Sequence, residues 1–224
     1  MNKFEKQYTV LRKLLENGIA LDIDETLADT NAYWAELIFR RHGHAGLGNA
    51  HDAIRAYKYV RNVPEWQTDE IRQKVSEFIH SDDVVLSTPP VRGSQEGVAS
   101  LRKIKTVSCY ISGRPRSVER ATYKWLHDHG FPESHVIFQP SVGDMTDMGF
   151  ENAETWRMEL LKFLYPNVGG LIYDNEHIVT HADGYKGRIY LLGSSIKAPN
   201  VTGCHDWEDV VRNISFYFHS SAGD

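Results

Sequence analysis

The sequence lacks the features that mark secreted and membrane proteins. It has only two cysteines, Cys109 and Cys204, which lie far apart and without the spacing of a metal site. A disulfide framework is therefore not expected, and a reducing compartment is the natural environment. No stretch approaches the roughly 20 consecutive apolar residues of a membrane-spanning helix. Residues 1–18 contain no continuous apolar core of signal-peptide length, so we expect a cytoplasmic protein with no membrane partner.

The chain also lacks any block of like charges, any internal repeat and any low-complexity tract. Its 25 Lys and Arg residues stand against 30 Asp and Glu residues, which gives a formal net charge of −5. A long polyanion such as duplex DNA is therefore not expected as a main partner. With 224 residues, 41% of them hydrophobic, the chain can form one large domain or one domain with a modest insertion.

Short apolar segments typical of buried strands alternate with helix-length periodic segments. The strand patterns lie at residues 19–23, 107–112, 136–138, 171–174 and 188–192. The helical patterns lie at residues 93–104, 117–129, 153–164 and 206–218. This alternation predicts an α/β fold, a Rossmann-like three-layer core in which helices cover both faces of a parallel sheet. Right-handed crossovers then bring the carboxyl ends of the strands to one edge.

Residues 28–88 interrupt this alternation, because they contain helical patterns only. We therefore predict a core domain formed by residues 1–27 and 89–224, with a helical cap domain at residues 28–88 inserted after the first strand. An insertion that leaves and re-enters a sheet at its functional edge is well placed to act as a lid. A helical elaboration that never moves is the alternative. Arg40 and Arg41 are candidates for binding a second substrate anion, although a solvated face is the favoured interpretation.

Two carboxylates end the first predicted strand. In the segment 19–27, the apolar run gives way to Asp22, Asp24 and Thr26. Burying carboxylates at the end of a strand costs folding free energy unless a partner, such as a divalent cation with a phosphate, compensates their charge. Asp22 is the candidate nucleophile, Asp24 the candidate acid and base, and Thr26 a candidate ligand of a phosphate oxygen. The alternative is a solvated turn in which Asp24 or Thr26 caps the next helix.

The second predicted strand ends in a hydroxyl. Ser112 closes the apolar segment, and Gly113 and Arg114 follow it directly. A hydroxyl beside a glycine that exposes backbone N–H groups suits a phosphate oxygen. We therefore assign Ser112 to the catalytic residues and Gly113 and Arg114 to substrate binding. A turn that simply ends the strand is the alternative.

A third strand pattern, at residues 171–174, again ends in a carboxylate. Asp174 can complete, with Asp22 and Asp24, an oxygen-rich site for Mg²⁺, which prefers a few carboxylates plus waters and substrate oxygens. A role for Asp174 in capping the following turn is the competing interpretation. The sequence thus predicts Mg²⁺ as the cofactor.

A basic side chain is also needed to neutralise charge on a transferring phosphoryl group. Arg157 and Lys162 lie on the predicted helix that precedes Asp174. Geometry favours Arg157, because the start of that helix lies on the edge where the acids gather. Residue type favours Lys162, because an ammonium is a compact charge often used to bind phosphate.

Taken together, these segments resemble the motifs of the haloacid dehalogenase-like (HAD) phosphohydrolase superfamily. In order, they are D-I-D-E-T at 22–26, I-S-G-R-P at 111–115, a basic residue before the last strand, and Y-D-N at 173–175. The resemblance spans roughly residues 18–193, and the insertion stands where that superfamily places its first kind of cap. The chain looks closest to deoxyribonucleotidase-like small-molecule phosphatases.

The resemblance implies a role for each motif residue. Asp22 would be the nucleophile and a metal ligand. Asp24 would be the acid and base, and would bind the metal through its backbone carbonyl. Ser112 would bind phosphate, and Asp174 would bind Mg²⁺.

The chain departs from the family's pattern at three positions. Glu25 stands where a glycine is common, Arg157 where a lysine is usual, and Asn175 where many relatives carry a second acid. The hypothesis that follows is a Mg²⁺-dependent phosphatase that hydrolyses a small phosphorylated metabolite, with a nucleotide as one candidate. A phosphotransferase, a phosphatase of nucleic-acid ends and a non-catalytic phosphate-binding relative stay open as alternatives. The oligomeric state does not follow from the sequence.

Overall fold

The centre of the molecule is a seven-stranded, mostly parallel β-sheet. The computed structural model describes residues 2–43 and 46–220, with the strand order β3-β2-β1-β4-β5-β7-β6. Neighbouring strands run parallel, except for β6 and β7, which are antiparallel. The strands are β1 (Gly18–Asp22), β2 (Thr106–Ser112), β3 (His135–Phe138), β4 (Val168–Tyr173), β5 (Arg188–Leu192), β6 (Lys197–Ala198) and β7 (Val201–Cys204).

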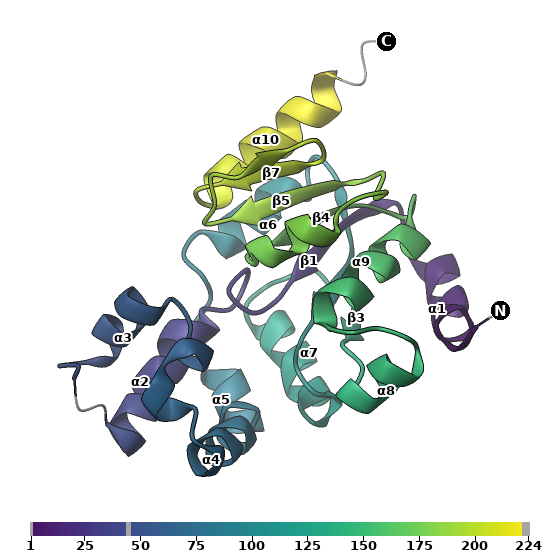
Figure 1. Ribbon diagram of the computed structural model, residues 1–224. Helices are drawn as coiled ribbons and strands as arrows, with labels where there is room; N and C mark the ends of the chain where they lie inside the picture. Colours follow the sequence, from purple (N-terminus) through teal and green to yellow (C-terminus); the bar gives the residue numbers. More distant parts are fainter. Residues whose placement is uncertain (1, 44–45, 221–224) are drawn as a thin grey trace.

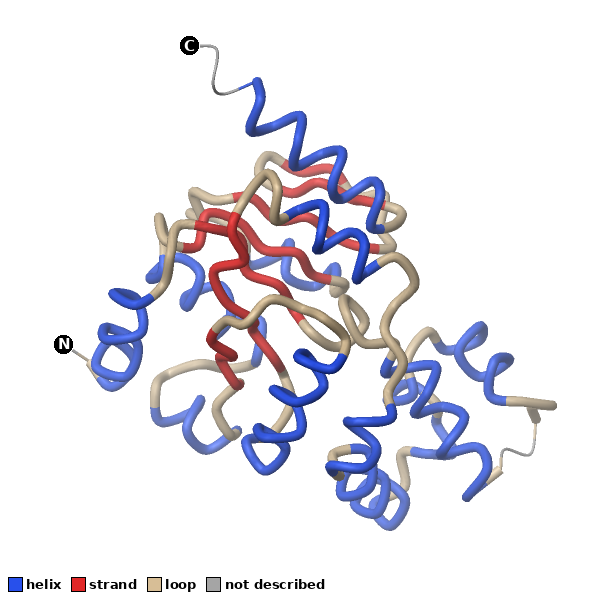
Figure 2. Tube along the Cα trace, turned by 180° about the vertical axis from the view of Figure 1, so that it is seen from behind, coloured by secondary structure: helices blue, strands red, loops and turns tan. Residues whose placement is uncertain are grey.

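Helices cover both faces of the sheet and give the three layers seen in Figures 1 and 2. On one face, α1 (Lys3–Leu14), α9 (Ala153–Leu164) and the 3₁₀ helix η4 (Glu176–His181) share one hydrophobic cluster with the strands. On the other face, the second cluster includes three helices: α6 (Ser94–Leu101), α7 (Glu119–Asp128) and α10 (Trp207–Ser220). The short helices α8 (Val142–Asp147) and η3 (Arg116–Val118) lie in the connections.

Strand β1 shows why the sequence forms a doubly covered sheet. All five of its residues are buried. Successive side chains point to opposite faces, so Ile19 and Leu21 join one hydrophobic cluster and Ala20 joins the other. Gly18 permits the close approach of β2, since a Cβ atom there would lie 2.3 Å from the carbonyl oxygen of Thr106. The central strand therefore has a fixed position, and its last residue, Asp22, is presented at the sheet edge.

Residues 28–88 form a helical lobe beside the sheet (Figure 1). Its hydrophobic core is separate from those of the sheet and includes Ile38 and Trp66. The last helix of the lobe packs on α7, and the indole N–H of Trp125 donates to the carbonyl of Thr88 at 2.7 Å. The lobe consists of α2 (Thr30–His42), α3 (Ala50–Tyr57), η1 (Val60–Asn62), η2 (Pro64–Trp66), α4 (Asp69–Ile79) and α5 (Asp82–Ser87).

The predicted α/β architecture with a parallel sheet is confirmed. All five expected strands are present, and α9 matches the helix expected at residues 153–164. Strands β6 and β7 and helix α8 were not predicted. These strands are short, and β7 contains Gly203, where a Cβ atom would lie 2.6 Å from the backbone nitrogen of Ile196. Their pairing depends on that close approach and not on a strong apolar pattern.

Within the described ranges, no helix combines the length and apolarity that crossing a bilayer requires.

A methyl group at position 97 should destabilise the protein. The added Cβ atom of Gly97→Ala would lie 2.5 Å from Cε3 of Trp207, whose indole N–H donates to the carbonyl of Thr26 at 3.0 Å. Because overpacking a buried contact costs ~1–3 kcal/mol, we expect the free energy of unfolding in urea to fall by about that amount. Gly143→Ala is the matched control, since the nearest atom to its Cβ is 4.0 Å away. Equal effects of the two substitutions would contradict this packing.

Candidate active site

The carboxyl ends of β2, β1 and β4 lie side by side at one edge of the sheet. Asp22 is the last residue of β1, Ser112 is the last residue of β2, and Asp174 directly follows β4. Strand β1 pairs with both neighbours, and Asp22 stands opposite Ile111 in the register with β2. Because all three strands are parallel, these three residues reach the same rim of the sheet.

Asp22 is a buried carboxylate beside a guanidinium. It is 4% exposed, and Nη2 of Arg157 donates to its Oδ1 at 3.4 Å. Burial raises the pKa of Asp22 well above its usual range; Arg157 lowers it, whereas the charges of Asp174 and Asp24 raise it further. The site therefore holds more negative than positive charge, and an additional cation would stabilise the ionised form of Asp22.

A hydrogen-bond network holds Arg157 in place. Its Nη1 donates to the hydroxyl of Tyr173 and to Oε2 of Glu154, the latter at 3.4 Å. Oε1 of Glu154 accepts from the Tyr173 hydroxyl at 2.8 Å and from the amide of Asn175 at 3.0 Å. Asn175, one of the positions where the chain departs from the family's pattern, thus binds the carboxylate that orients Arg157. The network fixes the guanidinium against Asp22.

Arg114 is paired with Asp24. Its Nε donates to Oδ1 and Oδ2 of Asp24 at 2.9 and 3.2 Å, and its Nη2 donates to Oδ1 at 2.8 Å. The guanidinium is buried, lies over the ring of Trp125 and also donates to the hydroxyl of Thr122. Although the sequence suggests Arg114 as a substrate ligand, the structure places this buried side chain outside the lining of the cavity and against Asp24.

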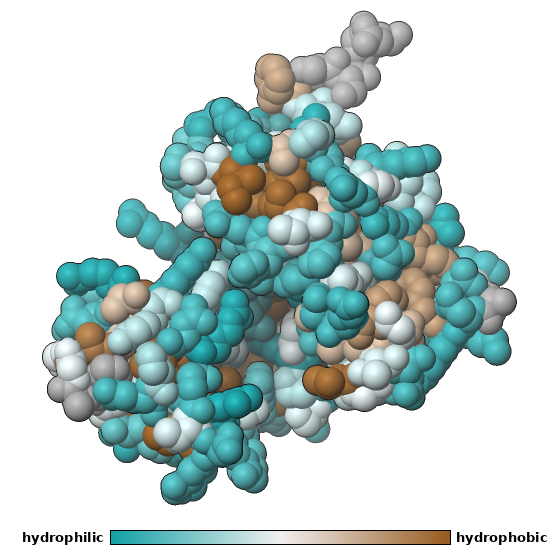
Figure 3. Space-filling model, in the orientation of Figure 1, coloured by the Kyte–Doolittle hydropathy of each residue, from teal (hydrophilic) through white to brown (hydrophobic). Residues whose placement is uncertain are grey.

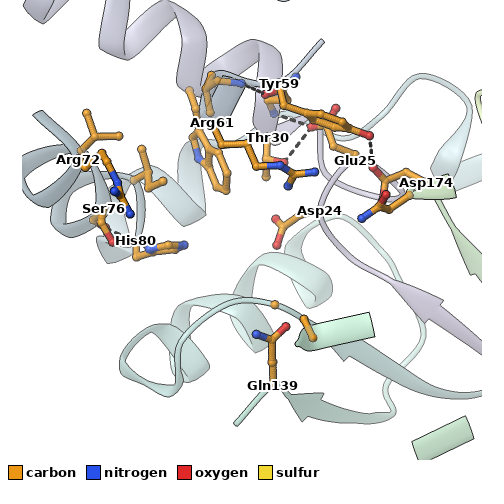
Figure 4. Close-up of a pocket in the computed structure, with 18 of the residues that line it drawn as sticks. Asp24, Glu25, Thr30, Tyr59, Arg61, Arg72, Ser76, His80, Gln139 and Asp174 are labelled. Atoms are coloured by element: carbon orange, nitrogen blue, oxygen red, sulfur yellow. Dashed lines mark hydrogen bonds between the residues drawn. The ribbon is translucent and has the colours of Figure 1, made fainter. Parts of the chain in front are cut away.

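Glu25 shows how the loop accommodates a residue other than glycine. Its φ of 62° lies in the left-handed region, which glycine adopts without strain. Its carboxylate compensates by capping α2: Oε1 accepts from the hydroxyl of Thr30 at 2.9 Å and from the backbone N–H of Asn31 at 2.5 Å (Figure 4). Burial raises the pKa of Glu25 to about 7. Glu25 thus joins the loop after β1 to the helical insertion.

Asp174 is contacted from the helical insertion. The hydroxyl of Tyr59 donates to its Oδ2 at 3.3 Å, and Figure 4 shows Arg61 extending from the insertion toward the space between Asp174 and Asp24. Burial raises the pKa of Asp174 to about 6, while Arg157, Tyr59 and Arg61 act in the opposite direction. The insertion thus supplies both a hydroxyl and a positive charge to the acidic rim.

A cavity of about 770 Å³ lies between the insertion and the sheet edge. In Figure 3 the surface is hollowed where the insertion meets the core. Asp22, Asp24, Arg157 and Asp174 form its floor on the core side. The side chains that face them come from the insertion and include Asn31, Trp34, Tyr59, Arg61, Arg72, Ser76 and His80.

Ser112, Gly113 and Thr26 take different places around this cavity. Gly113 lines it, and Ser112 is buried just behind, where its hydroxyl accepts from the backbone N–H of Arg114 at 3.2 Å. Thr26 does not line the cavity, and its hydroxyl is buried with no hydrogen-bond partner among the described residues. The carbonyl of Thr26 instead anchors the loop to Trp207.

Lys162 lies away from the site. It pairs with Glu159 at 2.9 Å and is not among the lining residues of the cavity. Five residues separate it from Arg157, which places it about 140° around the helix from the face that Arg157 presents. Of the two basic candidates, the structure therefore brings Arg157 to the acids and places Lys162 outside the cavity.

The residues at the rim fit a Mg²⁺ ion. Asp22 and Asp174 supply carboxylates, and no backbone N–H of the described residues donates to the carbonyl of Asp24. No three acidic, His or Cys side chains in the described part of the chain gather closely enough to hold a metal alone. The Asp24 carboxylate is turned to Arg114. Two carboxylates, one carbonyl and waters form a donor set that Mg²⁺ accepts.

Several site residues escaped the sequence analysis. Glu154 and Gln139 belong to the core and both line the cavity. The backbone N–H of Gln139 donates to the carbonyl of Ser112 at 2.8 Å, which holds Gln139 beside the end of β2. Tyr59, Arg61 and Arg72 come from the insertion. Glu154 carries a sequence signal, since it lies one helical turn before Arg157 and can reach the same side chain. Tyr59 is an aromatic that the sequence favours as a core residue.

The fold is that of HAD-superfamily hydrolases. Solved structures with this fold match most of the length of the chain, although with low sequence identity. A HAD-superfamily hydrolase of subfamily IA from Geobacter sulfurreducens is 13% identical, with a TM-score of 0.53, covering 89% of this chain and 98% of that one. A Bacillus subtilis protein named as a HAD hydrolase, solved with magnesium bound, is 13% identical with a TM-score of 0.55, covering 89% and 99%.

A third match is a Lactobacillus delbrueckii protein named as a phosphoglycolate phosphatase. It is 16% identical with a TM-score of 0.53, and the match covers 89% of this chain and 98% of that one. No family model matches the chain, and no curated protein does. The likeness is thus one of fold.

Asp174→Asn should stabilise the metal-free protein at pH 8. The pKa of the Asp174 carboxyl is about 6 in the folded protein, against its usual value of 3.8. Its ionisation therefore lowers the free energy of unfolding above pH 6, and this effect is absent well below pH 4. Removing the charge should therefore raise the free energy of unfolding by ~1–3 kcal/mol at pH 8. The same substitution should reduce the rise in melting temperature that Mg²⁺ produces, because one ligand is lost.

Thermal unfolding with and without Mg²⁺ measures both effects. Asp128→Asn is the control, since Asp128 is exposed and pairs with Lys124 at 2.6 Å far from the rim. It should leave the response to Mg²⁺ as it is in the unsubstituted protein. A destabilised Asp174→Asn variant with the full Mg²⁺ response would contradict the assignment of Asp174.

Proposed function

We propose that this protein is a Mg²⁺-dependent phosphatase that hydrolyses a small phosphomonoester through an aspartyl-phosphate at Asp22. The observation that carries the proposal is the meeting of Asp22, Asp24 and Asp174 with Arg157 around one cavity. The HAD-hydrolase fold and the magnesium bound in one protein with that fold support it. So does the phosphoglycolate phosphatase named among the matches.

In the first step, an Oδ atom of Asp22 attacks phosphorus and the bond from phosphorus to the leaving oxygen breaks. The proton that the leaving oxygen needs comes from Asp24. In the second step, Asp24 takes a proton from water, whose oxygen attacks the same phosphorus and releases Asp22. Mg²⁺ held by Asp22, Asp174 and the carbonyl of Asp24 would supply charge neutralisation for the phosphoryl oxygens.

Arg157 and Arg114 have separate tasks in this scheme. Arg157 contacts Asp22 directly and sets a positive charge beside the phosphoryl group as negative charge develops. Arg114 orients Asp24, and its strongest contacts are both with Oδ1. Oδ2 accepts only the longer contact of 3.2 Å, so it is the oxygen that carries the proton between leaving group and water.

The helical insertion acts as the cap that encloses the substrate. It forms the wall opposite the acids, and water excluded from such a site strengthens each electrostatic contact inside it. A cavity of about 770 Å³ accepts phosphomonoesters up to the size of a mononucleotide, which favours small metabolites over nucleic-acid ends. Both cysteines are free and buried, which suits the cytoplasm.

Asp22→Asn should abolish turnover while leaving the fold intact, because an amide oxygen is a poor nucleophile and the two side chains have nearly the same shape. We expect kcat to fall by about 10³-fold or more on an aryl phosphate, on mononucleotides and on sugar phosphates, each assayed with and without Mg²⁺. Asp128→Asn, with its exposed carboxylate, is the matched control and should keep full activity.

Circular dichroism should show that the Asp22→Asn variant is folded. A variant that retains activity within tenfold of the unsubstituted protein would remove the aspartyl-phosphate mechanism. Binding of a phosphate analogue with Mg²⁺ but no turnover on any ester would instead identify a non-catalytic relative.

A further inference from the structure

We propose that the cap recognises a second anionic group on the substrate, at the end of the leaving group far from the reacting phosphoryl. This inference rests on the proposed function and specifies its substrate class as an extended, hydroxylated phosphomonoester with a distal carboxylate or phosphate. The residues that carry it are Arg72, Ser76 and His80 of the cap.

These three side chains form a stripe on one face of α4 and its C-terminal cap. They are spaced by four residues, so they follow one another along the same side of the helix. All three line the cavity opposite the acidic rim, and Figure 4 shows Arg72 beside Ser76 with His80 nearer to Asp24. At 1.5 Å per residue, Arg72 lies about 12 Å along the helix from His80.

His80 marks the end of the stripe that is close to the chemistry. It lines the same cavity as Asp24, and Figure 4 shows its ring on the cap side with Asp24 on the core side. Burial lowers the pKa of His80, while the charge of Asp24 raises it and that of Arg114 lowers it. Nδ1 of His80 lies 3.0 Å from the carbonyl of Ser76, which can only accept a hydrogen bond. Nδ1 therefore carries the proton, and Nε2 is left as an acceptor for a substrate hydroxyl.

Arg72 marks the opposite end, where its exposed side chain lines the cavity. No ion pair of Arg72 is found among the described residues, and the carboxylate of Asp69, one turn before it on α4, is not within 4.0 Å. A guanidinium that lines a cavity without a carboxylate partner is suited to a bidentate contact with a carboxylate or phosphate.

Arg61 does not provide the distal contact, because it lies near the reacting end. It stacks over the ring of Tyr59 at 4.2 Å and contributes to the charge around Asp174. The arginines first considered for a second anion are also occupied elsewhere. Arg40 pairs with Glu36 at 2.9 Å, and Arg41 lies over the ring of Phe78 at 3.9 Å. Arg72 is thus the cap arginine placed for a distal group.

The spacing of the stripe suggests the length of the substrate. Because Arg72 lies about 12 Å along α4 from His80, we expect an anion bound by Arg72 to be on the order of 10 Å from a phosphoryl group at Asp22. A two-carbon leaving group is too short to span that distance, whereas an open six-carbon chain reaches it. Hydroxyls along the chain meet the acceptor on His80 and the hydroxyl of Ser76.

Two matched pairs of phosphomonoesters test this inference. In the long pair, 6-phosphogluconate and sorbitol 6-phosphate differ only in a terminal carboxylate against a hydroxymethyl group. In the short pair, phosphoglycolate and 2-hydroxyethyl phosphate differ in the same way. We expect kcat/KM to favour the acid by about tenfold in the long pair, mainly through KM, and to show no such preference in the short pair.

Arg72→Gln should remove the preference in the long pair, and Arg72→Lys should restore part of it by returning the charge without the planar fork. Arg40→Gln is the control, an exposed cap arginine outside the cavity, and should keep the preference. Equal kcat/KM values for the long pair in the unsubstituted protein would overturn the inference, as would a preference that survives in Arg72→Gln.

Failure of the phosphatase itself gives a different result. If no ester is hydrolysed, including an aryl phosphate, the proposed function is wrong. The esters then stay intact in the presence of the protein, and calorimetry can measure their Kd values. A Kd about tenfold lower for 6-phosphogluconate than for sorbitol 6-phosphate, lost in Arg72→Gln, would then still support the distal anion site. Equal Kd values would overturn it.

Discussion

The buried carboxylate of Asp22 is the constraint on which the rest of the site depends. A strand enclosed on both faces delivers this charge into a position that is 4% exposed, where an unpaired carboxylate is costly. One guanidinium at 3.4 Å offsets part of the cost, yet Asp174 and Asp24 add further negative charge. The orienting network around Arg157 and the pairing of Arg114 with Asp24 both offset this concentration of negative charge. The proposed Mg²⁺ ion would offset it further, and a buried acidic rim of low stability is what such a binding site requires.

Local sequence patterns predict the strands and the acidic rim of the candidate site. Apolar runs that end in Asp22, Ser112 and Asp174 predict buried strands, and the chirality of parallel crossovers then brings their ends together. Those two rules need no knowledge of side-chain packing. They leave Arg157 and Lys162 open as the basic residue, and only the structure places Arg157 against Asp22 and Lys162 outside the cavity. Strands β6 and β7 escaped because their pairing depends on a close approach at Gly203, which leaves no apolar pattern.

What the sequence could not predict is the long-range pairing of polar groups. Arg114 follows Ser112 in the chain, so it was assigned to substrate, but its side chain turns to Asp24, which is 90 residues away. Tyr59 and Arg61 reach the rim only because the insertion folds back over the sheet edge. Glu25 takes a left-handed conformation because two groups of α2 bind its carboxylate. The contacts of Tyr59, Arg61 and Glu25 depend on how the insertion packs on the core, and the contact of Arg114 depends on the packing of two neighbouring core loops.

The central claim is that Asp22 is a nucleophile held beside a cation, and a crystal structure with Mg²⁺ and beryllofluoride would test it most directly. Beryllofluoride mimics a phosphoryl group by bonding to a nucleophilic carboxylate. The account predicts beryllium bonded to an Oδ atom of Asp22, with Mg²⁺ bound by Asp22, Asp174 and the carbonyl of Asp24. Beryllofluoride attached to a different carboxylate, or Mg²⁺ bound away from Asp174, would contradict it.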